Sequence, residues 1–138
     1  MNSFIDNFTQ KCIQKPELIY LIDGIGAFVS LASMLLLYNL LPEHFTLPFT
    51  LRRNLLGIMF AIILMDSFFY YRGYLYYLKN IVLMNSIYCA ALALILISKF
   101  KHITSLEIAY FSIEMLVLIA VIALENHILR AYKNQFEG

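Results

Sequence analysis

The stretch Glu17–Leu41, ELIYLIDGIGAFVSLASMLLLYNLL, is apolar over about 25 residues and carries one acid inside it, Asp23. A helix of about 20 apolar residues crosses a hydrocarbon core of roughly 30 Å. Runs of similar length follow at Phe49–Tyr71, Ile81–Ser98 and Ser105–Leu129. Short connections make neighbouring helices antiparallel. The sequence therefore predicts an all-α integral membrane protein, an antiparallel four-helix bundle.

The composition supports a membrane protein. Hydrophobic residues make up 62% of the chain and charged residues 14%, whereas soluble domains have about 45–50% and roughly 25%. We expect residues 1–138 to form a single four-helix transmembrane domain whose main partner is the lipid bilayer. The net charge of +1 argues against nucleic acid as a partner, since phosphate binding needs a basic patch. No run of four Lys or Arg flanks a crossing, which argues against a dedicated anionic-lipid site.

The segment before the first crossing has two readings. Apolar side chains recur there near helical spacing, at Phe4, Ile5, Phe8, Cys12 and Ile13. This pattern predicts a short amphipathic helix in the membrane interface, and the alternative is a frayed tail. The first crossing itself exceeds the 7–15 apolar residues of a signal peptide, so we expect it to remain as a helix. Cys12 and Cys89 share no C-x-x-C motif and differ in depth, which predicts two reduced, inert thiols.

Four local signals mark the helix ends. Pro16 suits the first turn of the first crossing, where a missing N–H costs nothing. Thr46 is placed to cap the second helix, and Gly73 marks the turn into the third. Thr104-Ser105-Leu106-Glu107 matches a capping box for the fourth, which gives Glu107 a structural role.

Basic residues set the expected orientation. With four crossings, six of the ten Lys and Arg residues fall on the side of the termini: Lys11, Lys15, Arg72, Lys79, Arg130 and Lys133. The other four are Arg52, Arg53, Lys99 and Lys101. The positive-inside rule then predicts cytoplasmic N- and C-termini.

Each crossing places one polar side chain at about the same depth. Asp23, Asp66, Asn85 and Glu125 lie five to seven residues from the boundary on the side of the termini, or roughly 8–11 Å at 1.5 Å per residue. Ionisable groups inside a bilayer are costly and are functional candidates by default. Glu125, near a helix end, has an alternative role in which it snorkels or pairs with Arg130.

The expected helix faces bring these side chains together. Two helices each carry a stripe of small or polar residues: Asp23, Gly26, Ala27, Ser30 and Ser33 on the first, and Asn85, Tyr88, Cys89 and Ala93 on the third. On the fourth helix the three acids share one face with apolar residues: Glu107, Phe111, Glu114, Leu118, Val121 and Glu125. Asp66 shares its face with Met59, Ile62 and Tyr70. Small residues let membrane helices approach closely, so we expect these faces to converge inside the bundle.

The leading functional hypothesis is a carboxyl-lined cavity that binds or transports a proton, a metal ion or an organic cation. Asp23, Asp66 and Glu114 would be the ligands, with Asn85 and Tyr88 as neutral hydrogen-bonding partners. Glu125 completes the set of candidate binding residues. Four helices barely enclose a pathway, so transport would favour a homodimer.

Two other classes stay open. One is an accessory membrane subunit whose polar residues only fix helix packing. The other is an intramembrane enzyme that acts on a lipid-like substrate with carboxyls as acid and base. The chain has no Glu-x-x-His pair, no Gly-rich phosphate loop and no H-E-x-x-H. We therefore assign no catalytic residue and no cofactor, and no particular metal.

Overall fold

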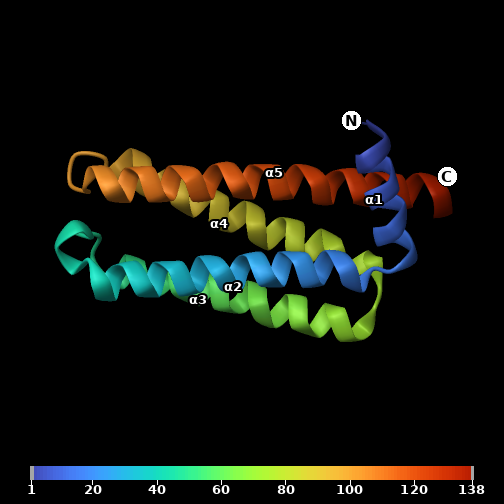
Figure 1. Cartoon of the computed structure of the whole chain (residues 1–138), viewed down its shortest axis with the longest axis horizontal. Coiled ribbons are helices and arrows are strands. Elements are labelled where there is room, and N and C mark those ends of the chain that lie inside the picture. The colour runs from blue at the N-terminus through green and yellow to red at the C-terminus, as the bar shows by residue number, and fades with distance from the viewer. Residues whose placement is uncertain (1, 138) are drawn as a thin grey trace.

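The computed structural model describes residues 2–137, and its four long helices pack antiparallel as a bundle (Figure 1). They are α2 (Glu17–Leu40), α3 (Phe49–Arg72), α4 (Leu78–Lys99) and α5 (Ser105–Phe136). All four are long and apolar enough to cross a membrane. The predicted fold class, an all-α membrane bundle with a short additional N-terminal helix, is confirmed.

The helix ends agree with the sequence signals in part. Gly73 ends α3 with φ +67°, a left-handed conformation that glycine adopts without strain. A 3-10 turn at Leu75–Tyr77 leads into α4, and another at Pro42–His44 follows α2. The capping role predicted for Thr46 is wrong, because Pro48 precedes α3 and makes no side-chain cap.

The predicted boundary of the last helix is also wrong. The apolar run ends at Leu129, but α5 continues to Phe136. Tyr132 and Phe136 extend the helical spacing past the charged Arg130 and Lys133, and Tyr132 packs against the buried cluster at this end of the bundle. Side-chain packing thus carries the helix about two turns beyond the membrane-length segment.

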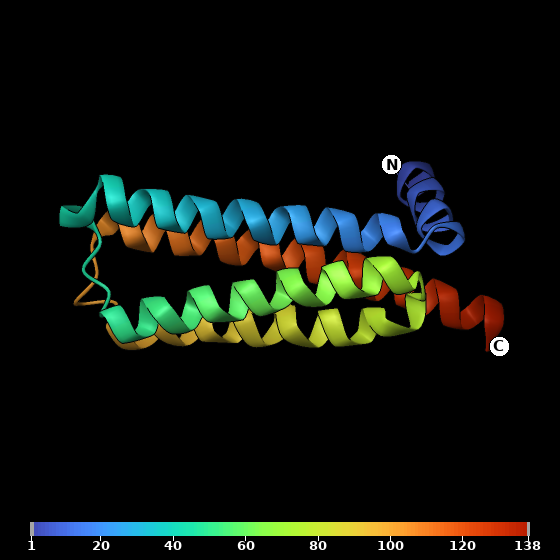
Figure 2. The same cartoon turned by 90° about the horizontal axis from the view of Figure 1, so that it is seen from below.

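Helix α1 (Asn2–Gln14) lies across one end of the bundle, beside the start of α2 and the end of α5 (Figures 1 and 2). Thr9 and Cys12 are buried against the bundle, whereas Phe4 is 75% exposed. The amphipathic helix is therefore confirmed over the frayed tail. An exposed phenylalanine on a helix set across the membrane spans suits the headgroup interface.

The outward faces of the four long helices are apolar. Exposed side chains include Ile97 at 79%, Leu116 at 66% and Phe28 at 60%. Apolar faces of this extent are characteristic of protein surrounded by lipid. The lipid bilayer is thus the environment that these candidate spans imply.

Two apolar clusters fill the core, and a polar layer separates them. One cluster, around Met34, Leu92 and Phe111, lies toward the end away from α1. The other, around Ile19 and Ile128, lies under α1. On α3 the order Ile62, Asp66, Phe69 runs from the first cluster through the layer to the second.

The burial of Cys12 gives a first testable expectation. The thiol is fully buried and desolvation raises its pKa to about 11. At pH 8 we expect a disulfide reagent such as DTNB to react with Cys12 about a hundredfold more slowly in the folded protein than in the unfolded chain, because only the thiolate attacks. The measurement uses Cys89→Ser, which leaves Cys12 as the only cysteine. Fast reaction of the folded variant would mean that α1 does not stay docked.

Candidate functional site

Asn85 is the centre of the polar layer. Its amide Nδ2 lies 3.1 Å from Asp23 Oδ1 on α2 and 3.2 Å from Glu125 Oε1 on α5. All three side chains are buried, with Glu125 fully so. Because Asn85 has two N–H donors, it can serve both carboxyls at once. One amide therefore joins three helices inside the bundle.

Asp66 lies beside this centre on α3. It is 1% exposed and interacts with Asp23 and Glu125. Neither of its oxygens has a hydrogen-bond partner among the side chains and backbone of the described chain. A Cβ added at Gly24 would lie 3.3 Å from Asp66 Cβ. Gly24 is thus the residue that lets α2 approach α3 at the polar layer.

The charge of this layer needs compensation. Three buried carboxyls lie in this layer, and the Asn85 amide donates to only two of them, Asp23 and Glu125, whereas Asp66 receives no hydrogen bond within the described chain. Ionised carboxylates so close together repel one another, and each is costly to desolvate without a counter-charge. The layer is therefore suited to hold shared protons or a cation.

Glu114 forms a second polar group deeper in the membrane. It lies eleven residues before Glu125 on α5, or roughly 16 Å along the helix. Tyr88 donates its hydroxyl to Glu114 Oε1 at 3.0 Å, and the hydroxyls of Ser30 and Tyr110 are neighbours of the same carboxyl. Glu114 Oε2 is buried, and within residues 2–137 no donor reaches it with the geometry of a hydrogen bond.

A cavity of about 100 Å³ joins the two groups. Its polar lining consists of Asp23, Ser30, Asn85, Tyr88 and Glu114, and the rest is mostly apolar side chains from α2, α3 and α5. Asp23 Oδ2, like Glu114 Oε2, is buried and unpartnered within the described chain. Asp23 and Glu114, each with one carboxyl oxygen that lacks a partner in the described chain, thus line the same small cavity.

The small-residue stripe of α2 explains why the cavity exists. Gly26, Ala27 and Ser30 line it, and a Cβ at Gly26 would meet nothing within 4 Å. Short side chains leave volume unfilled where α2 faces α5, and these two helices make few close contacts with each other. The expectation that Gly26 allows close helix packing is wrong, since Gly24 does so instead.

The structure distributes the six candidate residues over three places. Asp23, Asn85, Tyr88 and Glu114 line the cavity. Glu125 contacts Asn85 and does not extend toward water, since it is fully buried. Asp66 lines a separate groove of about 270 Å³ between α2 and α3.

Two further details differ from the sequence patterns. On α3 the buried face of Asp66 includes Met59 and Ile62, as expected, and continues with Phe69, whereas Tyr70 is 40% exposed and lines the groove beside Asp66. Tyr110, which sequence reasoning missed, donates its hydroxyl to the backbone oxygen of Ser30 at 3.3 Å. Its position four residues before Glu114 on the same helix was the available signal.

Glu107 has the structural role that the capping box predicts. Thr104 accepts from the Glu107 backbone N–H at 3.2 Å, and Glu107 Oε2 accepts from the Thr104 N–H at 2.9 Å. Glu107 Oε1 also accepts from the Leu47 N–H at 2.9 Å, and the Thr46 hydroxyl lies 3.0 Å from Oε2. The buried carboxyl therefore ties the α2–α3 loop to the start of α5.

Within residues 2–137, no three His, Cys, Asp or Glu side chains are grouped so that they could hold a metal ion. Comparisons with models of protein families, with curated proteins and with solved structures find no match. The chemistry of the polar layer and the cavity therefore follows from their own side chains.

Proposed function

We propose that the protein binds a small cation, in exchange with a proton, in the cavity between Asp23 and Glu114. The observation that carries this proposal is the pair of carboxyl oxygens without a partner in the described chain, Asp23 Oδ2 and Glu114 Oε2, on two residues that line one cavity. An unpaired buried carboxylate is costly, and a bound cation or proton removes that cost. The remaining carboxyls of the polar layer add negative charge on one side of the same cavity.

The size of the cavity limits the ligand. A volume of about 100 Å³ corresponds to about three water molecules at roughly 30 Å³ each. Pockets for drug-sized ligands measure about 300–1,000 Å³. The small volume of the cavity therefore favours an inorganic monovalent cation or a small ammonium ion over a large organic cation.

The apolar lining of the cavity favours a small ammonium ion over an inorganic cation. Ile22, Met59 and Val117 are among the side chains that surround the polar groups. An alkylammonium ion can donate hydrogen bonds to Asp23 or to Glu114 while its carbon atoms contact the apolar wall. An alkali ion would have to keep water molecules in the cavity to complete its coordination.

The test measures thermal unfolding of the purified protein with ammonium, methylammonium, tetraethylammonium, sodium and potassium at constant ionic strength. At a hundred times its Kd, a ligand stabilises the folded state by about 2.7 kcal/mol. We expect a rise of the unfolding midpoint with a small cation and none with tetraethylammonium. Asp23→Asn and Glu114→Gln should abolish the rise, because each removes a charge and keeps an acceptor oxygen.

Glu137→Gln, at the exposed end of α5, is the matched control and should respond like the wild type. An equal response of all variants would contradict the cavity site. No response in any of them would instead favour the accessory subunit, in which Asn85 and the carboxyls serve only to join the helices.

Transport is the further step of the same proposal. We infer that the end of the bundle with α1 faces the cytoplasm, since six of ten Lys and Arg residues lie there. Movement of the cation across the membrane would use a homodimer, because the cavity of one bundle lies between only four helices. Uptake of the stabilising cation into liposomes, with Glu114→Gln as control, tests this step.

A further inference from the structure

The turn between α4 and α5 carries a depression on the protein surface. Its volume is about 650 Å³, and it lies at the end of the bundle opposite α1. Residues of both helices and of the turn line it: Leu96, Ile97, Ser98, Phe100, Lys101, His102, Ile108 and Ser112. It is separate from the carboxyl cavity and shares no lining residue with it.

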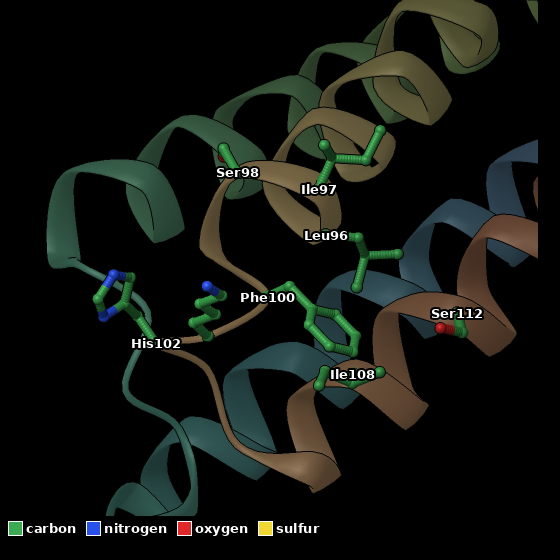
Figure 3. A pocket seen from close by; sticks show the side chains of 8 residues that line it. Leu96, Ile97, Ser98, Phe100, His102, Ile108 and Ser112 are labelled. Carbon is green, nitrogen blue, oxygen red and sulfur yellow. The ribbon is translucent and has the colours of Figure 1, made fainter.

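The depression is apolar inside and basic at its rim. Figure 3 shows the Phe100 ring between Leu96 of α4 and Ile108 of α5, with Ser112 further along α5 and His102 on the turn. Ser112 lies seven residues beyond the start of α5, or roughly 10 Å along the helix. The depression therefore extends from the turn into the part of the bundle that lipid surrounds.

No acidic side chain of α5 neutralises the basic residues at the rim of the depression. Lys101 and His102 are exposed, and Lys99 precedes them at the end of α4. Glu107, the acid nearest along the chain, is fully buried and directs its oxygens to Leu47 and Thr104. Lys101 and His102 are thus exposed to an anion from outside, and the adjacent α2–α3 loop, whose Thr46 hydroxyl lies 3.0 Å from the His102 carbonyl, carries one exposed acid, Glu43.

We propose that this depression binds an anionic phospholipid. The acyl chain lies against Leu96, Phe100 and Ile108, and the phosphate contacts Lys101 and His102. Charge complementarity at the rim favours a phosphate, and the apolar interior at membrane depth favours a lipid over a soluble anion. The chain lacks a long basic run, but two consecutive basic residues of the turn, Lys101 and His102, line this one depression.

The test is native mass spectrometry of the detergent-purified protein with phosphatidylglycerol or phosphatidylcholine of identical acyl chains. We expect one phosphatidylglycerol molecule to be retained in preference to phosphatidylcholine. Lys101→Gln should weaken this binding about fivefold, and the double variant Lys101→Gln/His102→Gln should weaken it further. The control Lys133→Gln, exposed at the opposite end, should bind like the wild type.

Two further experiments distinguish a bound lipid from a bound soluble anion. Ser112→Trp fills the deep part of the depression and keeps its charges, and it should also weaken phosphatidylglycerol binding. Inorganic phosphate at millimolar concentration should not displace the lipid. Equal retention of both lipids, equal binding by Lys101→Gln and the control, or displacement by phosphate would each overturn the proposal. Unfolding midpoints without added lipid show that the variants are folded.

Discussion

Glu107→Ala is expected to destabilise the folded bundle by roughly 3–4 kcal/mol. The substitution removes a fully buried carboxyl that accepts from the Leu47 and Thr104 backbone N–H groups. Both donors then lose their partner, and hydrogen bonds to charged acceptors contribute about 1.5–3 kcal/mol each. The loss is measured as the free energy of unfolding in one detergent, by heat or by a denaturing detergent.

Two variants define the cause of that loss. Glu107→Gln keeps one acceptor oxygen and should cost roughly half as much as alanine. Glu43→Ala changes an exposed glutamate on the loop that Glu107 holds, and it should be nearly neutral. If Glu43→Ala lowered the free energy of unfolding as much as Glu107→Ala, the hydrogen bonds from Glu107 to Leu47 and Thr104 would not be the source of the lost stability.

Asn85→Leu is expected to cost roughly 2–4 kcal/mol, more than a typical hydrogen bond between membrane helices at about 0.6 kcal/mol. Leucine has the same branched shape and a larger volume than asparagine, so the loss does not come from a new cavity. It comes from Asp23 and Glu125, which lose their shared donor while they remain buried. Thermal unfolding of the variant against the wild type measures the effect.

The same substitution at Asn80 is the matched control. Asn80 lies five residues earlier on α4, is partly buried and stands outside the polar layer. We expect Asn80→Leu to change stability by less than about 1 kcal/mol. Adding Glu125→Gln to Asn85→Leu should recover part of the loss, because it removes one unpaired carboxyl. Strict additivity of the two changes would show that Asn85 and Glu125 are not coupled.

Much of the polar layer could be predicted from the sequence because helix rise converts residue number into depth. Counting from Arg72, Lys79 and Arg130 placed Asp66, Asn85 and Glu125 at one level, and the structure brings Asn85 to Glu125 and Asp23. The capping box at Thr104 was likewise readable, since its contacts span only three residues. Both inferences depend on local geometry, which a regular helix fixes.

The close approach of α2 to α3 could not be predicted in the same way. The stripe through Gly26 and the neighbouring Gly24 are equally small in the sequence, and only the packing of α3 decides which one meets Asp66. The extension of α5 to Phe136 depends on its contact with the bundle end near α1. The link from Glu107 to Leu47 spans sixty residues and leaves no local pattern.

The sequence by itself determined the class, the four spans, the depth of the acids and the sharing of one end by both termini, because bilayer thickness and helix rise act on each segment separately. The tertiary structure alone decided which carboxyls share a cavity. Asp23 and Glu114 line it, whereas Asp66 lines a groove on another side of α2. The reason is that rotation of each helix about its axis follows from how its side chains pack against neighbours, and depth carries no information about that rotation.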